Sequence, residues 1–257
     1  MRSEALRPET SPLEPESGRR LPLFAFDLLR TGDAFEVFER RPPANGRARA
    51  TEYANDKLLL DAHGVSAALE SKVRDEVVQQ LEGNPQLVDR LAIARPIRVD
   101  IVPSGRQMAS LGFPKHASAG ASGLFWDHPT WPHARIGLLA QALENERALM
   151  IHEMAHAIAR LAFTQKEQDD VYQLMLPTYG TRGRVDEVFA IYSEREFLDA
   201  FTEREAHAPG VYGLARQRWD ERHVFTRFVR ALYFPYKPLA GGTAPSAHKG
   251  RRMPKLS

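Results

Sequence analysis

Apolar residues recur at helical spacing in the first third of the chain. Between residues 57 and 91 they follow one another at the intervals of one helix face. The clearest run is Leu69, Val73, Val77 and Leu81. Gly83-Asn84-Pro85 interrupts this pattern, and such a cluster is typical of a turn. The segment therefore predicts two helices joined by a turn.

The residues on either side of this helical segment differ in composition. Residues 1–20 are rich in Pro, Ser and charged residues and predict a disordered leader. Residues 21–38 are apolar and aromatic, which favours a helix or a strand-turn element that docks on the body, and residues 40–49 predict a loop. We therefore expect residues 21–95 to form an N-terminal helical lobe.

The pattern changes at Pro96. Residues 97–102 alternate between apolar and polar side chains, as a half-buried strand does. A loop rich in Gly, Ser and Ala is expected at residues 103–123. Two short strands are then predicted, at residues 124–126 and 134–139.

Helical spacing returns in the second half of the chain. We expect helices at about residues 145–163, 185–201 and 211–234, the last ended by Pro235 and Pro238. The order of helices, a few strands and helices again is typical of an α+β fold. Residues 239–257 are expected to form a disordered basic tail.

Composition narrows the classes of protein that this chain can be. A length of 257 residues fits one main domain with an added lobe. There is no cysteine, so disulfides, thiolate nucleophiles and cysteine-based zinc fingers are excluded, and any metal site must use His, Asp and Glu. The net charge is +2, but the tail from Gly241 carries four Lys and Arg and no acidic residue, which leaves about −2 for residues 1–240. A nucleic-acid partner is therefore not expected.

Targeting segments are not evident in the sequence. The first twenty residues lack the apolar stretch of a secretory signal, and no run approaches the roughly eighteen consecutive apolar residues of a membrane helix. The expected location is the cytoplasm, without membrane association. Export by a pathway that does not use such a signal is an alternative. The sequence does not indicate the oligomeric state.

One motif carries chemistry. His152-Glu153-Met154-Ala155-His156 is H-E-x-x-H within an apolar helical segment. Histidines four residues apart share a helix face, so both imidazoles can reach one metal ion. The glutamate beside the first histidine can then take a proton from a water on that metal. Two core histidines with a buried glutamate are the alternative, but an unpaired buried carboxylate is costly.

A third ligand is needed because catalytic zinc usually has three protein ligands. The extended motif with a third histidine downstream is excluded, since Ala159 and Ala162 occupy its Gly and His positions. A carboxylate from the next helix is the remaining source. Glu187 is the preferred ligand, with Asp186 as the alternative and Glu194 as a third candidate.

These residues resemble a known family. The motif at residues 152–156, followed by Asp186-Glu187-Val188-Phe189-Ala190, resembles the gluzincin class of zinc metallopeptidases. Within that class it is most similar to the catalytic domain of anthrax lethal factor and related bacterial toxin domains. The resemblance covers roughly residues 97–234. It implies a zincin-like catalytic domain at residues 96–238, with a small mixed sheet, an active-site helix and a ligand helix.

The resemblance also implies roles for residues outside the motif. Tyr179 corresponds to a tyrosine that steadies the oxyanion, and His223 is a second candidate for that role. Residues 123–126 or 134–139 correspond to a strand whose free edge binds an extended peptide. Gluzincins often carry an acidic residue four positions after the glutamate ligand, where it orients a histidine, but this chain has Ile191. Another group, such as Glu194, Asp186 or a backbone carbonyl, must take that role.

The expected function is that of a zinc-dependent endopeptidase acting on a protein or peptide substrate. One Zn²⁺ per chain is bound by His152, His156 and Glu187, with Glu153 as general base and Tyr179 as oxyanion donor. The resemblance leans toward a toxin-like effector. The alternative is a non-catalytic binding or regulatory protein that retains the fold with a structural or vestigial metal site, and Ile191 is its main support.

Overall fold

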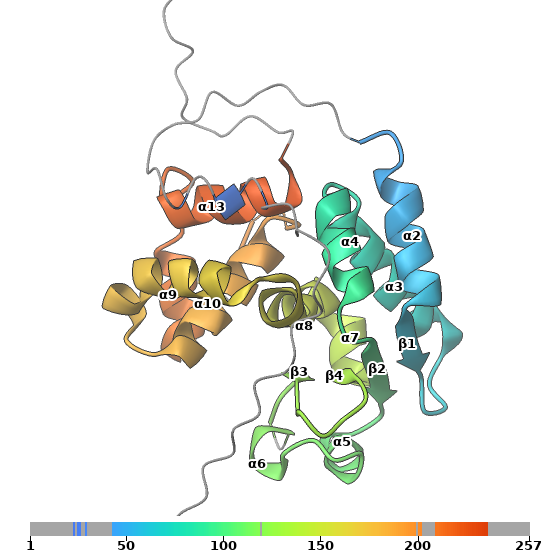
Figure 1. Cartoon of the computed structure of the whole chain (residues 1–257). Helices are drawn as coiled ribbons and strands as arrows, with labels where there is room; N and C mark the ends of the chain where they lie inside the picture. Colours follow the sequence, from blue (N-terminus) through green and yellow to red (C-terminus); the bar gives the residue numbers. More distant parts are fainter. Residues whose placement is uncertain are drawn as a thin grey trace, which may run out of the picture.

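The computed structural model describes residues 23, 25, 26, 29, 43–118, 120–198, 200, 201 and 209–235. The predicted leader at residues 1–20 and the predicted tail at residues 239–257 lie outside the described residues. A small sheet lies among helices that precede and follow it (Figure 1), in agreement with the predicted α+β class.

The helices of the described residues fall before, within and after the sheet. Their bounds are α2 (Gly46–Asp56), α3 (Ala67–Leu81), α4 (Pro85–Ile93), α5 (Gly105–Ser110), α6 (Lys115–Ser118), α7 (Ala140–Asn145), α8 (Leu149–Ala157), the π-helix η1 (Ile158–Ala162), α9 (Gln165–Tyr179), α10 (Arg182–Arg195), α12 (Gly210–Gln217) and α13 (Val224–Tyr233).

The sheet is mixed and has the strand order β1-β2-β4-β3. Its strands are β1 (Leu58–Asp61), β2 (Ile97–Val102), β3 (Gly123–Trp126) and β4 (Ala134–Leu139). The first three strands in this order run parallel, and β3 pairs antiparallel with β4 at the edge of the sheet. The predictions of strands at β2, β3 and β4 are confirmed.

The first strand was not predicted and corrects the helical assignment of its segment. Leu58–Asp61 lies within the span 57–91 that was expected to be helical, yet it pairs in register with β2. A run of three leucines followed by an acidic residue has no period that distinguishes a short strand from a helix turn. Its pairing with Ile97–Val102, distant in sequence, decides the outcome.

Several predicted helices differ in their bounds. The helix expected at residues 145–163 begins at Leu149 and passes into η1, and the one expected at 211–234 is two helices, because His223 caps a new helix by accepting a hydrogen bond from Phe225 N–H. The loop expected at residues 103–123 contains α5 and α6. Helix α9 was missed, although Thr164 and Glu167 form a capping box at its start.

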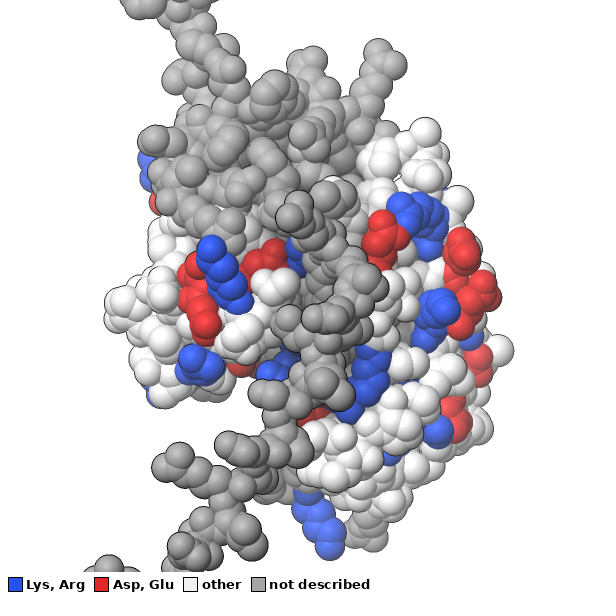
Figure 2. Space-filling model, in the orientation of Figure 1, with Lys and Arg blue, Asp and Glu red and all other residues white. Residues whose placement is uncertain are grey.

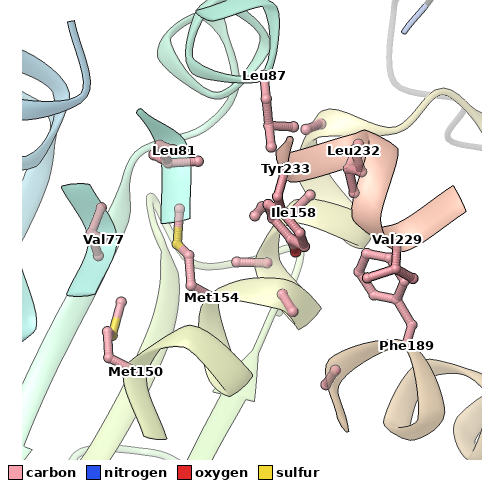
Figure 3. Packing of buried hydrophobic residues seen from close by; sticks show 14 of the residues in the cluster. Val77, Leu81, Leu87, Met150, Met154, Ile158, Phe189, Val229, Leu232 and Tyr233 are labelled. Carbon is pink, nitrogen blue, oxygen red and sulfur yellow. The ribbon is translucent and has the colours of Figure 1, made fainter. Parts of the chain in front are cut away.

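One continuous core joins the early helices to the rest of the described chain. Helix α8 lies in the middle, with α2 to α4 on one side and α9, α10 and α13 on the other (Figure 1). In Figure 3, Met150 and Met154 of α8 point toward Val77 and Leu81 of α3. Phe26, in the segment expected to dock on the body, is buried against Phe163, with ring centroids 4.9 Å apart.

A buried ion pair also joins the early helices to those that follow α8. Arg90 of α4 holds Glu167 of α9 through two hydrogen bonds, of 2.7 and 3.1 Å, and donates to the carbonyl of Ala162 at the end of η1. Residues of the predicted N-terminal lobe thus fix the segment that follows α8.

The described surface mixes charges of both signs. On the face drawn in Figure 2, acidic and basic side chains lie next to one another rather than in areas of one sign. In the described part of the chain, no helix has the length and apolar character that crossing a bilayer requires.

Candidate metal centre

Helix α8 carries the H-E-x-x-H motif through the core. All of its residues except His156 are buried. Its N-terminus has no side-chain cap of its own, because Ala148 occupies the cap position with a left-handed φ of 61°. Glu76 of α3 supplies the acceptor instead, with Oε2 3.1 Å from the backbone N of Met150. A carboxylate at this end of a helix is favourable, so α3 helps to fix the helix that bears the motif.

His152 and His156 face the same carboxylate. Glu187 of α10 has Oε1 3.6 Å from His152 Nε2 and Oε2 3.6 Å from His156 Nε2. The two imidazole centroids are 5.2 Å apart. One ligand atom from each of the three side chains lies within 4.8 Å of the other two. The structure therefore brings together the three residues that the sequence analysis selected as ligands.

The donor set fits Zn²⁺. Two imidazole nitrogens and one carboxylate are a common set of protein ligands for catalytic zinc, which keeps one further position open. Ligand atoms at about 2.0–2.1 Å from a tetrahedral ion are about 3.3 Å apart, so the two separations of 3.6 Å between an imidazole nitrogen and a Glu187 oxygen need to contract by only a few tenths of an ångström. Within the described part of the chain, no Lys or Arg pairs with Glu187. Burial would raise the pKa of Glu187, but His156 and His152 lower it by more.

Glu194 makes the contact with a histidine of the motif that was expected of an acidic residue at position 191. Its Oε2 lies 3.2 Å from His152 Nδ1, opposite the nitrogen that faces Glu187. Glu194 follows Glu187 by seven residues and so lies on the same helix face, two turns on. Ile191, at the position where an acidic residue was expected, is fully buried in the apolar core. Glu194, one of the named alternatives, makes the contact instead.

Helix α12 holds Glu194 in place. Tyr212 Oη donates to Glu194 Oε2 at 2.7 Å, and Arg216 Nη2 donates to Oε1 at 3.1 Å. The guanidinium of Arg216 lies 3.9 Å from the centroid of the Tyr212 ring.

Burial would lower the pKa of His152, but the hydrogen bond to Glu194 and the neighbouring carboxylates raise it to about 9. A metal must therefore displace a proton from this imidazole.

Glu153 lies beside the two histidines, against strand β3. It is 5% exposed, and burial raises its pKa although the two histidines act to lower it. Its carboxylate accepts a hydrogen bond from the backbone N–H of Phe125. It lines the same cavity as the three candidate ligands, a space of about 1380 Å³. Glu153 therefore borders the same open space as the three candidate ligands.

Asp186 lines both this cavity and a smaller one. The smaller cavity, of about 350 Å³, is bounded by His156, Phe125, Trp126, Phe163 and Phe189 among others. Asp186 lines both cavities and accepts a hydrogen bond of 2.8 Å from Tyr172 Oη. Burial raises its pKa. Asp186 lies outside the group that faces both histidines, so the geometry favours Glu187 of the two candidate ligands.

Tyr179 and His223 lie away from the site. Tyr179 is the last residue of α9, is 4% exposed and is hydrogen-bonded to Tyr192. His223 caps α13. Neither lines the cavity that contains Glu153, whereas Tyr212 does, with its ring centroid 5.9 Å from that of His152. Sequence reasoning missed Tyr212 and Arg216, since no local pattern links a residue of α12 to the motif.

A second group of ligand-type residues lies at the sheet. Asp61, His63 and Asp100 also offer ligand atoms within 4.8 Å of one another. The two carboxylates of this group, however, are already paired with guanidinium groups. Arg98 Nη2 is 2.7 Å from Asp61 Oδ2, and Arg135 Nη2 is 2.5 Å from Asp100 Oδ2. A metal would have to displace both arginines, so this group is an ion-pair network.

Comparison with known proteins adds no relative. No family model, curated protein or solved structure matches this chain.

Proposed function

We propose that this protein is a zinc-dependent endopeptidase with a zincin-like catalytic domain. The observation that carries the proposal is the arrangement of His152, His156 and Glu187, with the Glu153 carboxylate buried in the same cavity. A site with a purely structural role has no need of a carboxylate beside its ligands. The proposed ligands are His152 Nε2, His156 Nε2 and Glu187.

The chain's own residues divide the chemistry between them. When bound, Zn²⁺ supplies a Lewis acid that polarises the scissile carbonyl and lowers the pKa of water. Glu153 takes a proton from the attacking water on a carboxylate oxygen and delivers it to the leaving amine nitrogen. Glu194 holds the His152 ring through Nδ1, which keeps Nε2 directed toward Glu187. Tyr179 is left out of this machinery because its hydroxyl is hydrogen-bonded to Tyr192 away from the cavity.

The proposed substrate is an extended segment of a protein or peptide. Strand β3 is an edge strand that borders the cavity, and a peptide can pair with such an edge through backbone hydrogen bonds. The lining of the smaller cavity beside His156 includes five aromatic side chains and, among others, three charged ones: Phe125, Trp126, Phe163, Tyr172 and Phe189, with Asp127, Arg160 and Asp186. We expect it to take a large apolar side chain next to the scissile bond.

Substitution of Glu153 tests the proposal. Glu153→Gln keeps the size of the side chain but removes the base, so peptidase activity should fall by about 10²–10⁴-fold while zinc stays bound. The assay uses a denatured protein and a mixed peptide library, with and without a chelator. Glu146→Gln is the control, since Glu146 lines the same cavity but contacts Ser122 rather than the candidate ligands. Unchanged activity in zinc-loaded Glu153→Gln would contradict the proposal.

The non-catalytic alternative has lost its main support. It depended on Ile191 leaving the histidine without an orienting carboxylate, and Glu194 is in contact with that histidine.

A further inference from the structure

Strand β3 approaches Glu153 so closely that there is no room for a side chain at residue 123. A methyl carbon placed on Gly123 would lie 2.6 Å from Glu153 Oε1, 2.7 Å from Cγ and 2.9 Å from Cδ. Such separations are far below van der Waals contact. Gly123 and Glu153 therefore share a space that holds one side chain and not two.

The backbone at Gly123 does not itself require glycine. Gly123 is the first residue of β3 and pairs with Leu138, and it is not among the glycines with positive φ. The backbone conformation at this position is therefore open to alanine as well as to glycine. The contact with Glu153 is therefore the physical reason for glycine at this position.

Glu153 has little freedom to move away from an added side chain. It is 5% exposed and lies on α8 between two histidines that face Glu187. Its carboxylate is tied to β3 by the N–H of Phe125, two residues after Gly123. The overlap includes Cγ, which is near the root of the side chain, so rotation of the carboxylate alone does not relieve it.

We propose that Gly123 is a positioning residue that sets where the Glu153 carboxylate lies relative to the metal ligands. This inference rests on the proposed function, in which Glu153 is the general base. The same strand is proposed to bind the substrate backbone along its free edge. Base and substrate are then both held by β3, and a side chain at residue 123 would move the base and leave the substrate in place.

Gly137 provides a matched control in the neighbouring strand. It lies in β4 opposite Leu124, one register position from Gly123. The nearest atoms that a methyl carbon on Gly137 would meet are three side-chain atoms of Met108, at 3.0–3.1 Å. Methionine is unbranched and adapts its shape readily, so Gly137→Ala adds the same atom to the same sheet without touching Glu153.

A double-mutant cycle on thermal stability tests the contact without reference to activity. Gly123→Ala should lower Tm by about 2–10 °C, as expected for an overpacked core. In a Glu153→Ala background the same substitution should leave Tm nearly unchanged or raise it, because the space has been vacated. An equal loss in both backgrounds, or no loss in either, would overturn the contact. If Gly123→Ala does not fold, recovery of folding in the double variant supports the contact and failure to recover overturns it.

Steady-state kinetics test the consequence for catalysis. Gly123→Ala should lower kcat by about 100-fold or more, since small displacements of a catalytic group are costly, while KM and zinc per chain stay at wild-type values. Gly137→Ala should retain kcat. Wild-type kcat in Gly123→Ala, or an equal loss in Gly137→Ala, would overturn the positioning role. If wild type cleaves nothing, the proposed function fails and the positioning role with it, while the stability cycle still decides the contact.

Discussion

Two groups of ligand-type residues in this molecule look alike by proximity and differ in charge. His152, His156 and Glu187 lie between α8 and α10, and Asp61, His63 and Asp100 lie on the sheet. Among the described residues, the carboxylate of the first group faces two imidazoles and pairs with no Lys or Arg. In the second, guanidinium groups have taken the carboxylate oxygens that a metal would need.

The difference shows that proximity alone does not make a metal site. A carboxylate that already accepts charge-assisted hydrogen bonds from arginine has few lone pairs left for a cation. Asp100 is fully buried and is compensated by Arg98, Arg135 and His63. Glu187 is about one third exposed along its side chain and borders a large cavity. The carboxylate of the first group borders open space, whereas that of the second is already paired with arginine.

The largest expected effect concerns the stability of the second group. Asp100→Asn should lower the free energy of unfolding by about 3–5 kcal/mol, because the arginines of the ion-pair network lose the buried carboxylate that pairs with them. Urea denaturation measures this change. Asp61→Asn, whose side chain is 44% exposed, should cost under about 1 kcal/mol. Loss of zinc from Asp100→Asn while it is folded would contradict the division between the two groups.

A smaller effect is expected at the first group, on zinc affinity. Glu194→Gln should weaken zinc binding by about 10- to 100-fold, because the ligand His152 loses its charged hydrogen-bond partner. Competition with a chromophoric chelator measures the affinity. Glu196→Gln is the matched control, since Glu196 is equally buried at the end of α10 but pairs with Arg230. Equal losses in the two variants would remove the orienting role from Glu194.

The smallest expected effect is the pH dependence of the second group. Burial would raise the pKa of Asp100, but hydrogen bonds from His63, Arg135 and Arg98 lower it by more. A carboxylate whose pKa is lowered by folding stabilises the protein above its unfolded pKa of 3.8, and this stability is lost as pH falls through the folded value. The difference in unfolding free energy between wild type and Asp100→Asn should therefore shrink as pH falls below about 4 and through the lowered folded value. A difference that grows on acidification would contradict this assignment.

The sequence predicted the first group because most of its information is local. His152, Glu153 and His156 lie about one helix turn apart, and Glu187 follows on a later helix with the composition of a buried helix. The partners of His152 were harder to find. Glu194 was named among several alternatives, whereas Tyr212 and Arg216 reach it from a helix that the sequence did not separate from α13.

The second group could not be predicted because its members are distant in sequence. Asp61 and Asp100 meet through the pairing of β1 with β2, and β1 lies in a segment expected to be helical. Arg135 joins them from β4, whose pairing with β2 was also not specified by local pattern. Strand pairing between distant segments is decided by tertiary packing, so a single sequence contains no spacing that reveals such a network.

Zinc per chain is the measurement that tests the account most directly. Elemental analysis of protein purified without added metal should give about one zinc in wild type and in Asp61→Ala, and much less in Glu187→Ala. That result would place the metal at the first group and leave the second as an ion-pair network. No zinc in wild type after reconstitution, or equal zinc in wild type and Glu187→Ala, would contradict the three-ligand site and the endopeptidase that we propose on it.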